Sequence, residues 1–133
     1  MNVVSIDELK IVGVFDHGIP NMERVVLQAN ESIDLGNYGL IIGIRGHEGQ
    51  AFPLRDNFLW FGNGWLNKGD WLFVYTAPGT SKTTDLPNQK EKLYSVHWGK
   101  DQTLFQHKEL IPLLIRMDAI QVPIGINALP PPV

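Results

Sequence analysis

The 133 residues of this chain are close to the usual size of one domain, and 44% hydrophobic against 19% charged residues excludes a disordered protein. A net charge of −3 with dispersed lysines and arginines disfavours nucleic-acid binding, which usually needs a basic face. The absence of cysteine excludes disulfides, thiol nucleophiles and thiolate zinc sites.

The start of the chain and its apolar runs predict where the protein resides. Residues 1–8 lack the basic start and long apolar core of a secretory signal. The longest nearly apolar run, Tyr38 to Ile44, is far shorter than the roughly 20 residues that span a bilayer. We therefore expect a soluble, cytoplasmic protein without membrane contact.

The first half of the chain reads as short strands between turns. Leu9 to Phe15 is β-branched and apolar, and Met22 to Ala29 alternates, with Val25, Leu27 and Ala29 on one face. Tyr38 to Arg45 is apolar on both faces, which predicts a central strand covered on each side.

Glycine, proline and aromatic residues mark the next strands. Gly43 predicts a bulge or a close approach of backbone within its strand. Phe52 to Leu54 reads as a short edge strand limited by Pro53, and Phe58 to Phe61 as a separate aromatic strand. Trp71 to Ala77 alternates and predicts a strand with two different faces.

The second half contains one long polar segment and two further strands. Pro78 to Lys92 is expected to be a loop, and Leu93 to Trp98 a strand. Thr103 to Phe105 is expected to pair back, and His107 to Leu110 to form one helical turn. Ile111 to Val122 is the last predicted strand.

These elements predict one all-β domain, a sandwich or barrel of about seven to nine strands with at most one short helical turn. We assign residues 1–122 to this domain and residues 123–133 to a proline-rich tail. Pro130 to Pro132 favour a polyproline conformation that is able to dock on a neighbour.

Three segments, Glu23 to Leu27, Asp34 to Leu40 and Leu66 to Val74, together with Asn30, resemble the lamin-tail domain. The similarity covers residues 22–76, and it departs from the family where Asn67 and Lys68 replace the usual proline before Gly69. It implies an immunoglobulin-like β-sandwich with an accessory, partner-binding role. It implies no catalytic residue.

The four histidines are His17, His47, His97 and His107, and none stands at a metal-ligand spacing. We assign no catalytic residue, no metal ligand and no cofactor, and expect His97 to be a partly buried, hydrogen-bonding residue of its strand. The alternative is a small hydrolase or metal-dependent enzyme that uses His17, His47 and Glu48.

Five aromatic residues, Phe58, Trp60, Phe61, Trp65 and Trp71, fall within fourteen positions. Alternation places Trp60 and Phe61 on opposite sides of their strand. One interpretation is a two-layer core with Trp65 as a corner plug. The other is an exposed patch that binds a protein partner, a sugar or a second copy of the chain.

The expected function is that of a non-catalytic interaction module for protein–protein recognition or for self-association as a homodimer. The candidate binding residues are Trp60, Trp65, Trp71, Tyr38 and His47, with the loop from Pro78 to Lys92 as an adaptable rim. Carbohydrate binding by the aromatic face is a second alternative.

Overall fold

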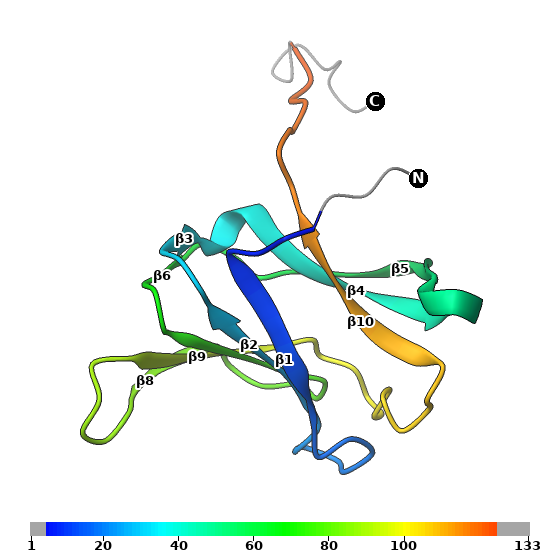
Figure 1. Cartoon of the computed structure of the whole chain (residues 1–133), viewed down its shortest axis with the longest axis horizontal. Coiled ribbons are helices and arrows are strands. Elements are labelled where there is room, and N and C mark those ends of the chain that lie inside the picture. The colour runs from blue at the N-terminus through cyan, green and yellow to red at the C-terminus, as the bar shows by residue number, and fades with distance from the viewer. Residues whose placement is uncertain (1–4, 125–133) are drawn as a thin grey trace, which may run out of the picture.

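The structure is a computed structural model that describes residues 5–124 of the chain, and these residues form an all-β, sandwich-like fold (Figure 1). Two short 3₁₀ turns are present, η1 (Leu35–Asn37) and η2 (His47–Gly49). The strands are β1 (Leu9–Phe15), β2 (Arg24–Ala29), β3 (Ile33–Asp34), β4 (Tyr38–Arg45), β5 (Ala51–Trp60), β6 (Trp65–Leu66), β7 (Trp71–Tyr75), β8 (Lys82–Asp85), β9 (Lys92–His97) and β10 (Leu110–Arg116).

The strands form two main sheets and one small ladder. The five-stranded sheet has the order β1-β2-β7-β9-β8, the three-stranded sheet has the order β10-β4-β5, and β3 pairs with β6. Strands β7 and β9 are parallel, whereas the other pairs are antiparallel. Strand β4 is therefore central in its sheet, as its apolar sequence predicts.

The core lies between the two main sheets and follows the predicted alternation. Val25 and Leu27 of β2 are completely buried, and Leu72 of β7 points to the same side. Leu40 of β4 faces them from the other sheet, where Leu59 packs beside it. Each fully buried leucine or valine contributes roughly 1.5–3 kcal/mol, so this layer is the main source of stability.

Strand β5 is one continuous strand, so the prediction of separate strands at Phe52–Leu54 and Phe58–Phe61 was wrong. Its register with β4 shifts between Ile41 and Gly43, because Ile41 pairs with Phe58 while Gly43 pairs with Pro53. The extra residues of β5 bulge out opposite Ile42. The shift confirms the irregularity that Gly43 predicted.

Two predictions on the second half were also wrong. The segment from Pro78 to Lys92 contains β8, which pairs with β9 at the edge of its sheet. All four residues of β8 are exposed, so its sequence lacks the apolar alternation that would have predicted a strand. The last strand ends at Arg116 rather than Val122, because no strand among the described residues pairs with the chain beyond it.

The connection between β9 and β10 has neither the predicted strand nor the predicted helical turn. His107 to Leu110 form a hydrogen-bonded turn, closed by the N–H of Leu110 and the carbonyl of His107 at 3.1 Å. Residues 103–105 do not pair as a strand, because two of their N–H groups bind a buried carboxylate instead.

That carboxylate belongs to Glu23, which is only 1% exposed. It accepts hydrogen bonds from the N–H groups of Gly18, Leu104 and Phe105, each at 2.9 Å, and from the Thr76 hydroxyl. Burial alone would raise the pKa of Glu23, but these donors together lower the pKa below its ordinary value. The Glu23 carboxylate is thus hydrogen-bonded to the β1–β2, β7–β8 and β9–β10 connections and holds all three together.

We expect Glu23→Gln to lower the free energy of unfolding by about 2–4 kcal/mol, because an amide N–H₂ would face the donors of the buried carboxylate. The folded pKa is lowered, so this stabilisation is fully present above the ordinary value of 4.5 and is lost as pH falls from there through the lowered folded pKa. Urea unfolding of wild type and variant at neutral and acidic pH measures both effects.

The exposed Glu31→Gln serves as the matched control and should leave stability within about 0.5 kcal/mol. A Glu23→Gln variant as stable as this control at neutral pH would contradict the role of Glu23.

Candidate functional site

The structure does not bring the five predicted binding residues together. Trp60 ends β5 and is 48% exposed, whereas Trp65 lies on β6 and is 53% exposed. Trp71 belongs to β7 of the other sheet, Tyr38 is buried, and His47 lies exposed in η2. The interpretation of Trp65 as a corner plug is therefore wrong, because more than half of its side chain meets solvent.

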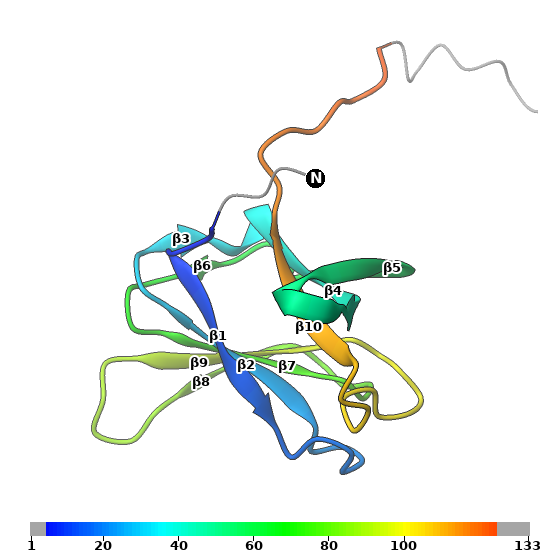
Figure 2. The ribbon, with the colours of Figure 1, turned by 45° about the vertical axis from the view of Figure 1, so that its right-hand side comes forward.

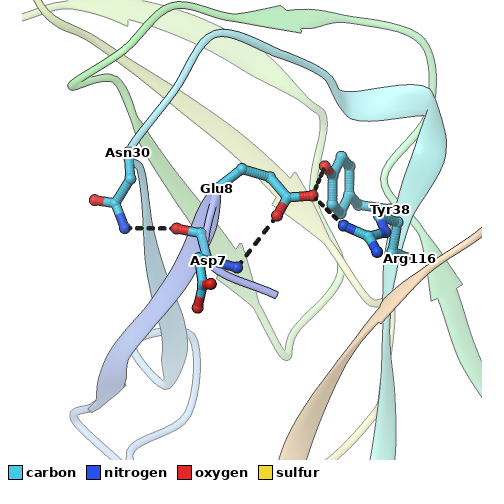
Figure 3. A network of polar contacts seen from close by, with 5 residues as sticks. All are labelled: Asp7, Glu8, Asn30, Tyr38 and Arg116. Atoms are coloured by element: carbon cyan, nitrogen blue, oxygen red, sulfur yellow. Dashed lines mark hydrogen bonds and ion pairs between the residues drawn. The ribbon is translucent and has the colours of Figure 1, made fainter. Parts of the chain in front are cut away.

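Tyr38 is part of a polar network that joins three distant segments (Figure 3). Its hydroxyl donates to Glu8 Oε2 at 2.6 Å, and Arg116 Nη1 donates to the same oxygen at 2.7 Å. The hydrogen bonds from Tyr38 and Arg116 lower the pKa of Glu8 to about 2. Burial and the bonded Glu8 carboxylate raise the pKa of Tyr38 to about 12. Tyr38 therefore holds the fold together and has no free hydroxyl for a ligand.

Trp60 belongs to an apolar surface on the side of the three-stranded sheet that faces away from the core. Directly opposed residues in antiparallel strands point to the same side of the sheet. The pairs Leu113–Ile41, Phe58–Ile41 and Trp60–Gly39 thus share one side. We call the following six side chains the outer apolar face: Ile41, Phe58, Trp60, Ile111, Leu113 and Ile115.

Two glycines of β4 shape the outer apolar face. A Cβ at position 39 would lie 2.5 Å from Phe58 Cζ, and a Cβ at position 43 would lie 2.5 Å from Leu113 Cδ1. The Phe58 ring and the Leu113 side chain therefore lie directly over the backbone of β4. The glycines make room for large side chains from both neighbouring strands.

The six side chains of the outer apolar face are uncharged and partly open to solvent, and Arg45 lies on the same side at the end of β4. Phe58 is 43% exposed, and the four aliphatic members are partly exposed. The indole N–H of Trp60 donates to the carbonyl of Gly36 at 2.9 Å, so the only polar group of the face is already paired. In Figure 2, no element among residues 5–124 covers this side of β4, β5 and β10. The prediction that β4 is covered on each side therefore holds only in part: Gly39 and Gly43 are buried beneath the Phe58 and Leu113 side chains, whereas Ile41 is partly exposed.

Trp71 lines a separate groove of about 290 Å³ on the outer side of the five-stranded sheet. The guanidinium of Arg24 lies there, 5.2 Å from the ring centre of Phe73, and forms an ion pair with Asp16 at 2.7 Å. Leu86 also lines this groove, so the segment from Pro78 to Lys92 contributes to its rim. The expected rim thus adjoins Trp71, and residues 81–83 also line a cleft with Phe61 and Gly62.

A cleft of about 530 Å³, lined mostly by polar residues, adjoins Glu23. Thr76, Lys100 and Gln102 are among its lining residues. Both oxygens of Glu23 are occupied by backbone and hydroxyl donors, so the carboxylate is not placed to take a proton from a ligand. This cleft contains a structural carboxylate rather than a general base.

The four histidines belong to different strands, turns or connections of the chain. His97 stacks on Tyr75 with ring centres 5.1 Å apart, and its Nδ1 lies 3.3 Å from the carbonyl oxygen of Ala77, which confirms the partly buried, hydrogen-bonding role. His17, His47 and His107 are exposed. Within residues 5–124, no three histidine, aspartate or glutamate side chains group as metal ligands.

Sequence reasoning found Trp60 and Phe58 but missed the aliphatic part of the outer apolar face. The signal was present: Ile111, Leu113 and Ile115 share one phase of the last strand, and Ile41 lies on β4. Their common surface depends on the pairing of β10 with β4, two strands that are about 70 residues apart in the chain.

No family model, curated protein or solved structure matches this chain. Among the described residues, no helix is long and apolar enough to cross a membrane. Any assignment of function therefore depends on the surfaces described above.

We expect alkaline titration to show one phenol that ionises at about pH 12, followed by absorbance at 295 nm, and Tyr38→Phe to remove this step. Because the folded pKa of Tyr38 is raised, its stabilising effect is present below the ordinary value of 10.0 and is lost as pH rises toward 12. For Glu8, the effect is present above 4.5 and is lost as pH falls toward 2.

Tyr94→Phe is the control, because Tyr94 lies in β9, outside the network, and this variant should retain the step near pH 12. Loss of the step in Tyr94→Phe, or its persistence in Tyr38→Phe, would show that the Glu8 network does not hold the phenol.

Proposed function

We propose that this protein is a non-catalytic interaction module that binds a protein chain through the outer apolar face of its three-stranded sheet. The observation that carries the proposal is a sheet face with two exposed aromatic rings among six uncharged side chains. Contiguous exposed apolar patches on soluble domains usually mark interaction sites. The proposal retains the predicted role of Trp60 and replaces Trp65 and Trp71 with Phe58 and Leu113.

The energetics favour a protein partner. Burial of apolar surface contributes about 25 cal/mol per Å², and aromatic rings such as those of Phe58 and Trp60 are enriched at the centres of interfaces. An open face suits another flat surface or an extended segment, since a small molecule gains most from an enclosed cleft. The six uncharged side chains of the outer apolar face favour an apolar partner.

The same geometry supports carbohydrate binding less well. A sugar stacks on aromatic rings but also needs hydrogen-bonding groups for its hydroxyls. The indole N–H of Trp60 is the only side-chain donor of the outer apolar face, and it is bonded to Gly36. A hydrolase that uses His17, His47 and Glu48 has no specific observation in its favour, since all three side chains are exposed and lie on loops or turns.

The similarity of residues 22–76 to the lamin-tail domain supports the same proposal. Under that similarity the chain is an immunoglobulin-like sandwich whose task is to bind partners rather than to catalyse a reaction. Two packed sheets with an uncovered outer side are compatible with this role.

A photo-cross-linking amino acid at position 58 tests the proposal. We expect p-benzoylphenylalanine in place of Phe58 to form a covalent protein adduct when the producing cells are irradiated, because the ring would lie inside the interface. The control carries the same group at the exposed position 68, on the turn before β7, and should form no adduct. The readout is the mass of the tagged protein on a denaturing gel.

Substitution on the face provides the complementary result. Phe58→Ser together with Leu113→Ser should lower the yield of adduct formed by a cross-linker at position 60, with only a modest change in melting temperature, since both side chains lie outside the core. Absence of any adduct from position 58, or equal yields at positions 58 and 68, would refute the interaction module.

A further inference from the structure

Residues 118–124, which follow β10, carry a second set of exposed apolar side chains. The N–H of Met117 donates to the carbonyl of Asn37 at 2.7 Å, and the chain then leaves the body, as both views show (Figures 1 and 2). Ile120 is 80% exposed, Val122 is 68% exposed and Ile124 is fully exposed. We call residues 118–124 the arm.

The apolar residues of the arm occupy alternating positions, so Ile120, Val122 and Ile124 would share one side in a fully extended arm; in the structure Ile124 lies in a turn. The arm contains no glycine, and Pro123 restricts Val122 to extended conformations. Seven extended residues span roughly 23 Å. This length matches that of β10, which also has seven residues and runs along the outer apolar face.

The arm is not placed to cover the outer apolar face of its own chain. That face lies back along β10, whereas the arm runs onward from the end of the strand. The exit is held by the bond between Met117 and Asn37 and by the ion pair between Arg116 and Glu8.

We propose that the arm of one copy lies on the outer apolar face of a second copy, with Ile120, Val122 and Ile124 against Phe58, Trp60 and Leu113. This inference depends on the proposed function, because it names the partner of that face. Both surfaces are apolar, and each copy has one of each. Reciprocal exchange of arms therefore closes into a two-fold symmetric dimer.

The test compares the purified wild-type chain with two arm variants by sedimentation velocity between about 1 and 100 μM. Ile120→Ser, Val122→Ser and Ile124→Ser together should weaken dimerisation about 100-fold or more, because three buried side chains are lost from each arm. The matched control, Ala119→Ser with Gln121→Ser, changes the opposite side of the same arm and should dimerise like wild type.

A mixing experiment tests the pairing of the two surfaces. The arm variant retains an intact face, and a Phe58→Ser, Leu113→Ser variant retains an intact arm. Each should be monomeric alone, and the two together should form a heterodimer through the single remaining contact.

A monomeric wild-type chain at 100 μM would overturn the exchange of arms, and so would an arm variant that dimerises as tightly as the control. If the cross-linker at position 58 then still captures a different protein, the interaction module stands and only the second copy is refuted. If position 58 captures nothing, both proposals fail.

Discussion

Strand β4 is apolar on both of its faces, and the rest of the structure depends on what covers each of them. Its inner side, with Leu40, packs against the five-stranded sheet and forms half of the core. Its outer side is built from Gly39, Ile41 and Gly43, over which Phe58 and Leu113 lie. A sheet with two apolar faces needs cover on both, and residues 5–124 supply cover for one. The uncovered face is therefore the feature from which the function is inferred.

The buried polar groups show why recognition rather than catalysis is proposed. Glu23 is saturated by four donors and fixes three connections, and Glu8 is bonded to Tyr38 and Arg116. Each of these carboxylates has a lowered pKa, because its donors stabilise the charged form. A general base instead needs a pKa near the working pH and an open approach. These two carboxylates therefore hold loops and strand ends in place rather than act as general bases.

Local patterns were sufficient to predict most of the fold. The alternation around Val25 and the two-sided apolar run from Tyr38 predicted β2 and β4, and Gly43 marked the irregular register. Strand β8 was not predicted, because an exposed edge strand has no apolar periodicity. The site was predicted only in part: aromatic density pointed to Trp60, but whether Trp65 and Trp71 share its surface depends on long-range pairing that one sequence does not reveal.

The most specific claim of this account is that a second copy of the chain covers the outer apolar face in solution. Trp60 and Trp65 allow a direct comparison, because their exposed fractions within one chain are nearly equal, 48% and 53%, and only Trp60 belongs to that face. Hydroxyl-radical footprinting at high protein concentration measures how fast each indole is oxidised. Our account predicts that Trp60 is oxidised several-fold more slowly than Trp65, with this protection lost on dilution. Equal rates for the two indoles at every concentration would contradict it.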